Sequence, residues 1–88
     1  MNELLKRELD RITKERDCYN LKAVELKIEQ KSHSDYERLR DMFYHVNNGI
    51  SNIAEERTTE EEKTKLEINT ADLYLKKIST ILERYSDI

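Results

Sequence analysis

The sequence lacks several residue types that compact domains and active sites commonly use. It has no proline and no tryptophan, and only one glycine, one phenylalanine and one cysteine. A single glycine cannot build a glycine-rich phosphate loop. A single cysteine, Cys18, cannot form a disulfide within the chain, so we expect a reducing compartment, either cytoplasmic or cytoskeletal. No apolar run approaches the roughly 20 residues that a membrane-spanning helix needs.

Charge of both signs is abundant and well mixed. The 88 residues include 16 Lys and Arg and 19 Asp and Glu, for a net charge of −3. Nucleic acids and anionic membrane surfaces both select a concentrated basic face, so we expect neither as a partner. The hydrophobic share of 36% is low for a compact domain of this length. Because the apolar residues are periodic, this composition favours long helices that bury one stripe.

The clearest pattern runs from residue 36 to residue 57. Large side chains recur here at intervals of three and four residues, which places them on one narrow face of a helix. They are Tyr36, Leu39, Phe43, Val46, Ile50 and Ile53. The pattern keeps its phase across Asn47-Asn48-Gly49. We therefore expect a continuous or kinked helix through this stretch, with the glycine allowing another helix to approach closely.

Residues 2–31 form an a/d heptad seam, which is typical of coiled-coil pairing at this length. The seam consists of Leu5, Leu9, Ile12, Arg16, Tyr19, Ala23, Leu26 and Gln30. Its a positions contribute less to helix pairing than its d positions do, because two of them are polar and one is small. Arg16 either fixes the register in which the helices pair or lies with its aliphatic stem along the seam and its guanidinium group in water. We favour the second interpretation. A second stripe is formed by Leu21, Val24 and Ile28, and it predicts that this helix packs in a group of three or more helices.

The heptad pattern is interrupted at residues 31–35. The next large side chain, Tyr36, comes one position before the place that the heptad would give it. Ser34 and Glu37 have the spacing of a capping box, in which a serine and a glutamate satisfy free backbone N–H groups. The helix either breaks here or continues with a slip of one residue. Because neither glycine nor proline is present, we expect continuity with a local irregularity at 32–35.

A clear boundary follows at residues 56–62, where two threonines each precede a glutamate by three positions. Three glutamates at residues 60–62 suit the first turn of a helix, and we prefer this role to cation binding. The new helix should run from about residue 60 to residue 86. Its stripe is Ile68, Ala71, Leu75, Ile78, Leu82 and Tyr85, widened by Tyr74, Ile81 and Ile88. So broad a face should pack against at least two helices, with an antiparallel return.

The sequence shows no set of residues with the spacing of a catalytic, cofactor-binding or metal site. His33 and His45 would stand about 18 Å apart along one helix, and neither has a second ligand at metal spacing. We therefore predict no enzyme activity, no cofactor and no metal. Five tyrosines indicate either an interface with another chain or packing inside this one.

One segment resembles a known family. Residues 46–55 read Val-Asn-Asn-Gly-Ile-Ser-Asn-Ile-Ala-Glu. They are similar to a segment of the coiled-coil subunits that dock outer dynein arms onto ciliary doublet microtubules, where a Gly-Ile pair precedes a linker and a leucine-rich helix. Here that helix would be residues 73–85, and the linker is short, acidic and free of proline. The resemblance implies an axonemal scaffold with tubulin and dynein-arm partners.

These patterns predict an all-α chain: a coiled coil or long helical hairpin with one helix over 1–57 and a returning helix over 58–88. The predicted function is a structural scaffold segment that joins other coiled-coil chains, as a homo- or hetero-oligomer, and cytoskeletal proteins. The alternative is a self-contained three-helix adaptor that binds a helical peptide. The predicted interface residues are Leu5, Leu9, Ile12, Tyr19, Leu26, Tyr36, Leu39, Phe43, Val46, Ile50, Ile53, Ile68, Leu75, Ile78, Leu82 and Tyr85.

The register of the last helix can be tested with two matched substitutions. Ile78→Asp places a charge in the apolar stripe and should prevent folding or assembly, whereas Leu73→Asp lies outside the stripe and should be tolerated. Circular dichroism and thermal melting of both variants make the comparison. Equal losses from the two substitutions would reject this register.

Overall fold

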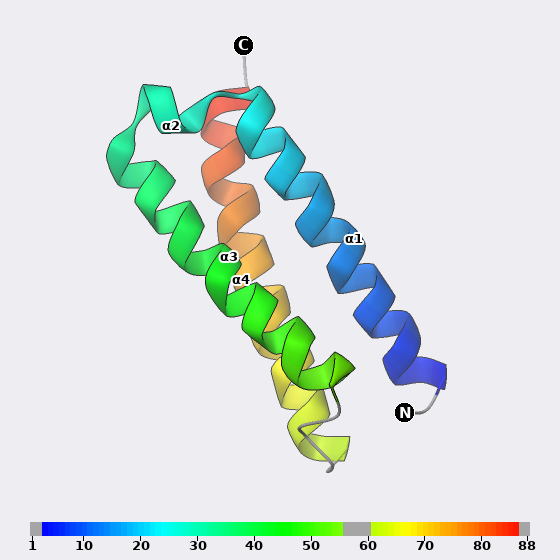
Figure 1. Cartoon of the computed structure of the whole chain (residues 1–88). Helices are drawn as coiled ribbons and strands as arrows, with labels where there is room; N and C mark the ends of the chain where they lie inside the picture. The colour runs from blue at the N-terminus through cyan, green and yellow to red at the C-terminus, as the bar shows by residue number, and fades with distance from the viewer. Residues whose placement is uncertain (1–2, 56–60, 87–88) are drawn as a thin grey trace.

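The computed structural model describes residues 3–55 and 61–86, which are helical apart from short connections (Figure 1). The helices are α1 (Glu3–Glu25), α2 (Ile28–Lys31), α3 (His33–Ala54) and α4 (Glu61–Ser86). No strand occurs in these two ranges, so the predicted all-α class is confirmed. None of the helices within them is both long and apolar enough to cross a membrane.

The three long helices form a short antiparallel bundle of 42 × 19 × 16 Å (Figure 1). α1 runs in one direction, α3 returns, and α4 runs back beside both, while α2 forms a single turn at one end. α4 makes its most extensive contacts with α3 and the next most extensive with α1, whereas α1 and α3 contact each other least. The chain is therefore a compact bundle, and the predicted long coiled-coil hairpin is not confirmed.

The core lies along the faces that the spacing of apolar residues predicts. The fully covered side chains include Ile12 on α1, Val46 on α3 and Ile78 on α4. Leu73 is 53% exposed on the outer side of α4, as the predicted register requires. Burying such aliphatic side chains stabilises the fold by about 1.5–3 kcal/mol each.

The expectation of one continuous helix over residues 1–57 is wrong, because α1 ends at Glu25. Lys27 adopts left-handed backbone angles, with φ 57° and ψ 41°. Its N–H donates to the carbonyl of Val24 at 3.1 Å, which is one of the bonds of a Schellman helix end. The reversal covers Ile28, which is 1% exposed, and brings α1 back over the core. Long-range burial thus overrides a local sequence that contains no helix breaker.

The start of α3 also differs in detail from the prediction. The capping residue is Ser32, whose hydroxyl accepts a hydrogen bond from the N–H of Asp35 at 3.2 Å. The break therefore falls at 26–32, earlier than the expected irregularity, and the proposed Ser34 cap is not used. Both predicted threonine caps near residue 58 lie outside the described residues.

α3 runs without a break through Asn47-Asn48-Gly49, as predicted. Gly49 is buried where α3 meets α4, so another helix does lie against it, but the approach is not so close that it requires a glycine. A Cβ atom at this position would lie 3.5 Å from Oε2 of Glu67 and 3.8 Å from the Cβ of Ala71. These are ordinary van der Waals separations, so the site has room for one methyl group.

An ion-pair cluster joins α1 to α4. The guanidinium of Arg11 donates to both carboxylate oxygens of Asp72, at 3.0 and 2.9 Å. It also contacts Glu8 at 2.6 Å and Glu15 at 3.2 Å on its own helix. The hydrogen bonds to Asp72 and then to Glu8 raise the pKa of Arg11 above its ordinary value. These groups are partly exposed, so the cluster mainly fixes how α1 lies on α4 and adds little stability.

Replacing Gly49 with alanine should stabilise the protein. Alanine lowers the entropy of the unfolded chain and favours the helix by about 1 kcal/mol, and its methyl group fits beside Ala71. The expected rise in Tm is about 4–8 °C by calorimetry. Gly49→Leu is the opposing variant, because its longer side chain has to displace α4 and should lower the Tm. A lower Tm for Gly49→Ala would show that the helices pack more tightly here than described.

Candidate protein-interaction groove

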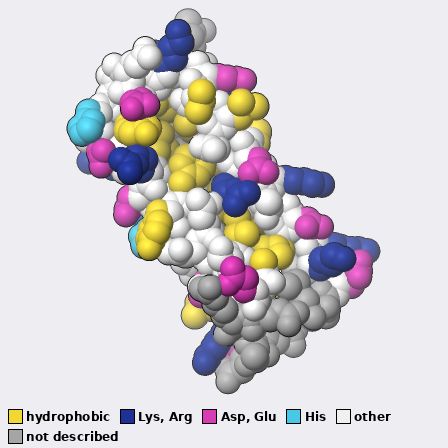
Figure 2. Space-filling model, in the orientation of Figure 1, with side chains coloured by type: hydrophobic (Ala, Val, Ile, Leu, Met, Phe, Trp, Pro, Cys, Tyr) yellow, Lys and Arg dark blue, Asp and Glu magenta, His cyan; other side chains and the backbone are white. Residues whose placement is uncertain are grey.

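A groove of about 550 Å³ opens between α1, α2 and α3. Figure 2 shows hydrophobic side chains gathered along this face, between the two long helices that are turned toward the viewer. Among the described residues, none from α4 lines it. The apolar lining residues include Ala23, Val24, Tyr36, Leu39 and Phe43.

Several side chains that line the groove are exposed to solvent, so it is an open surface groove and not a cavity within the core. Leu39 is buried at its base, while Tyr36 and Phe43 pack partly against the core and partly face outward. Val24 is 70% exposed and Tyr44 is 62% exposed, and both lie at the edge of the groove. Apolar side chains on both rims and at the base form a continuous surface that another apolar segment could cover.

The groove exists because the predicted a positions on α1 and α2 carry no large apolar side chain here. Arg16, Ala23 and Gln30 all line the groove or its continuation. A leucine at any of these positions would reach across and cover the aromatic rings of α3. The polar and small residues that make the heptad weak therefore leave Tyr36 and Phe43 accessible.

A polar bridge crosses from α1 to α3 beside the main groove. Arg16 donates to the Oδ1 of Asn47 at 3.3 Å and pairs with Asp17 at 2.9 Å. A smaller hollow of about 200 Å³ continues there, and Phe43 lines both hollows. Arg16 thus reaches across to α3 through a hydrogen bond, while its charge is balanced within its own helix.

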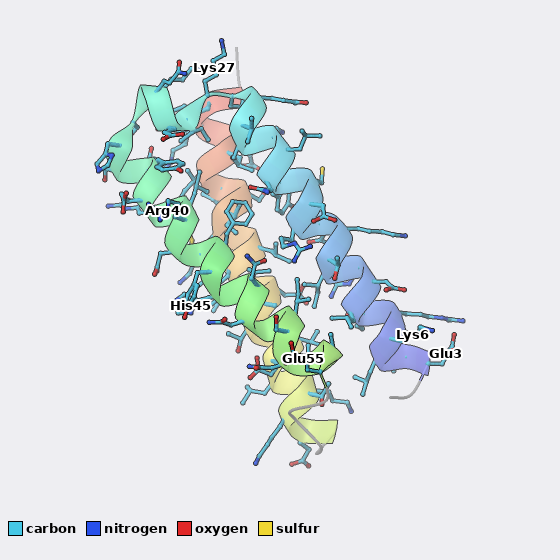
Figure 3. All side chains as sticks on the ribbon, viewed as in Figure 1. Glu3, Lys6, Lys27, Arg40, His45 and Glu55 are labelled. Carbon is cyan, nitrogen blue, oxygen red and sulfur yellow. The ribbon has the colours of Figure 1, made fainter. Side chains whose placement is uncertain are left out.

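Positive charge is concentrated at the end of the groove near α2. Lys27 lies there, and Arg40 projects from α3, as the labels in Figure 3 show. The Arg40 guanidinium carbon lies 5.8 Å from the centre of the Tyr36 ring, a cation–π contact that extends the flat surface of the ring. Glu37 is 3.6 Å from Arg40 but does not line the groove. Glu29 is the one carboxylate among the described lining residues at this end.

The structure places the predicted interface residues inside a single chain. Nine are buried in its core: Leu5, Ile12, Leu39, Val46, Ile53, Ile68, Leu75, Ile78 and Leu82. Seven are partly buried against that core: Leu9, Tyr19, Leu26, Tyr36, Phe43, Ile50 and Tyr85. Apart from Leu39, which forms the base of the groove, the buried nine do not line the groove while the bundle is closed. Only Leu39, Tyr36 and Phe43 of the whole set line the groove.

Several residues of the groove were not singled out from the sequence. Lys27, Arg40 and Asn20 line it, and no periodic pattern distinguishes them from other polar surface residues. Val24 did stand out, as part of a second apolar stripe on α1. That stripe divides in the structure, because Ile28 is buried while Leu21 and Val24 are exposed.

The remaining reactive side chains are dispersed. Within residues 3–55 and 61–86, no group of three His, Cys, Asp or Glu side chains could hold a metal ion. Cys18 is an exposed free thiol on α1. His45 stacks on Tyr74 of α4, with ring centres 4.7 Å apart, and therefore lies at the edge of the seam between α3 and α4.

Comparison of the chain with protein-family models, curated proteins and solved structures gave no match. The resemblance to dynein-arm docking subunits therefore stays a prediction from residues 46–55 and 73–85.

A hydrogen bond ties the start of α3, which carries Tyr36, to the end of α4. The Tyr85 hydroxyl donates to a carboxylate oxygen of Asp35. This bond raises the pKa of Tyr85 above its ordinary value of about 10. Because the protonated phenol makes the bond, its stabilising effect is complete below about pH 10 and is lost as the pH rises through the raised pKa.

Thermal melting of the native chain and of Tyr85→Phe should show this dependence. The native chain should have the higher Tm from about pH 7 to pH 10, and the difference should disappear at higher pH. Other titrating groups are common to both proteins and cancel in the comparison. A Tm difference that stays constant to about pH 11.5 would contradict the assignment of this hydrogen bond.

Proposed function

We propose that this chain is a small helical adaptor that binds one amphipathic helix of a partner protein in the groove between α1 and α3. The observation that supports this most is the accessible apolar surface of Tyr36 and Phe43 within a groove of about 550 Å³. Grooves of this kind receive the apolar face of a helix, with anchors spaced by three, four and seven residues.

The alternative, a coiled-coil scaffold segment, has less support. A scaffold needs apolar stripes that are free to pair with other chains. Here the stripes of α1, α3 and α4 cover one another, and Ile12, Val46 and Ile78 have no exposed surface. The groove is a short, concave stretch of accessible apolar surface, which suits one inserted helix better than a long coiled coil.

The spacing of the anchors sets the register of the bound helix. Tyr36 and Phe43 stand seven residues apart, so their rings are separated by two turns, or about 10.5 Å along α3. Two apolar residues of the partner, also seven apart, would match them. Ala23 is small and leaves room between the rims for an intervening leucine or isoleucine.

The charged residues along the groove also restrict which partner helices can bind. The chain as a whole has a net charge of −3, yet the groove is lined by Lys27 and Arg40 against Glu29, while Arg16 and Asp17 pair with each other in the smaller hollow. Arg40 also pairs with Glu37 outside the groove, so the end near α2 presents Lys27 and Arg40 against one carboxylate of the lining. We therefore propose that the partner helix carries glutamate or aspartate beside its apolar stripe. Such rim charges contribute mainly to specificity and to the rate of association.

Three synthetic peptides with one shared leucine stripe and flanking Glu, Gln or Lys residues provide the test. Titration into labelled protein, followed by NMR, should shift the signals of Ala23, Tyr36 and Phe43, with the Glu peptide binding most tightly. Val24→Asp places a charge on the exposed rim and should weaken binding of every peptide about tenfold. Arg40→Glu should weaken the Glu peptide far more than the Gln peptide.

Leu73→Asp is the matched control, because it adds the same charge to an exposed leucine on the outer side of α4. It should leave the affinity for all three peptides unchanged. If no peptide shifts the groove signals, or if Leu73→Asp weakens binding as much as Val24→Asp does, the groove is not the binding surface.

A further inference from the structure

We infer that the connection between α1 and α3 is a hinge that can straighten into continuous helix, so that α1 packs onto α3 and α4 of a second copy of this chain. The product is a domain-swapped dimer in which each copy supplies one α1 to the other. This inference is independent of the proposed function, because it concerns the core contacts of α1 and not the occupant of the groove.

The closed hinge adopts a conformation that its own sequence disfavours. Residues 26–31 read Leu-Lys-Ile-Glu-Gln-Lys, and most of these residues are strong helix formers. Lys27 nevertheless has a φ of 57°, in the left-handed region that residues with a Cβ rarely adopt. It is the one non-glycine residue with positive φ in the part of the chain that the structure describes. Local preference and the closed fold therefore conflict at this position.

Few backbone angles have to change for the hinge to open. Helical bonds from residue i to i−4 already join Leu26 to Lys22, Ser32 to Ile28 and Tyr36 to Ser32. The residues that flank α2, Lys27 and Ser32, both have non-helical angles, and the φ of Ser32 is −154°. Opening requires rotation at these two flanking positions, which would bring α1, α2 and α3 toward one continuous helix.

The contacts of α1 can be made again within a dimer. α1 is held by its buried Leu5 and Ile12 and by the pairing of Arg11 with Asp72, and all of these groups face α3 or α4. Because α1 runs antiparallel to α3, two straightened helices that lie antiparallel place each α1 beside the other copy's α3 in the original orientation (Figure 1). Exchange of an identical element preserves its interface, and short strained hinges favour it.

Two features oppose opening. Ile28 is buried in the closed hinge, and Ser32 caps α3 through the N–H of Asp35. The swapped dimer should therefore be a minor species that grows with protein concentration. A substitution that destabilises the monomer but not the mixed dimer should raise the fraction of that dimer.

Charge reversal across the Arg11–Asp72 pair provides such a substitution. In a chain with Arg11→Asp, the new carboxylate faces Asp72, and in a chain with Asp72→Arg, two guanidinium groups meet. Each variant therefore disfavours its own closed monomer. In a swapped heterodimer of the two variants, both α1–α4 contacts again pair a cation with a carboxylate.

The two variants should be unfolded together, refolded as an equal mixture, and examined by native mass spectrometry and thermal melting. We expect a heterodimer whose fraction exceeds that of either homodimer by about tenfold, and whose Tm is higher than that of either variant alone. The double variant R11D/D72R in one chain is the control. It restores the pair internally and should fold as a monomer with little dimer.

A second comparison tests the hinge itself. Lys27→Gly removes the steric conflict of the left-handed conformation, so adding it to both variants should reduce the heterodimer fraction. If the mixture yields only monomers while the double variant folds, the swap does not occur. A heterodimer that is insensitive to Lys27→Gly would overturn the role of the hinge.

Discussion

The packing of α4 against both other long helices is the interaction on which the rest of the structure depends. Its face is wide enough to cover α3 and α1 together, and Leu75, Ile78 and Leu82 are almost completely buried along it. Because α4 satisfies the apolar stripes of both neighbours, α1 and α3 do not have to close over each other. The open groove thus follows from two features together: burial is concentrated along α4, and polar or small residues face α3 from α1 and α2.

Much of the fold follows from apolar spacing, and the missing part has a physical reason. Three features follow from apolar residues that recur every three or four positions: the buried stripe of α4, the continuity of α3 through Gly49 and the all-helical class. The reversal at Lys27 is different, because most of the local residues favour helix, whereas burial of Leu5, Ile12 and Ile28 favours the turn. No property of residues 26–32 alone reveals which of these two effects is larger.

The candidate site was partly visible in the sequence, although not as a site. The polar or small a positions at Arg16 and Ala23 on α1 and at Gln30 on α2 marked the face that fails to cover α3. Recognising this as a groove required knowing that α1 folds back beside Tyr36 and Phe43, which in turn depends on the unpredicted turn. The cations Lys27 and Arg40 carry no periodic signal, so their placement at one end of the groove emerges only from the folded chain.

The direction of the helices has a mechanical consequence. The first residue of α1 and the last residue of α4 lie at opposite ends of the rod, and the two helices run in the same direction (Figure 1). Tension applied between these two points would slide α1 along α4 lengthwise. Leu5, Arg11 and Ile12 would then resist together and would not be peeled away in turn. A bundle loaded in this way should resist stretching by shear between α1 and α4, with these contacts sharing the force.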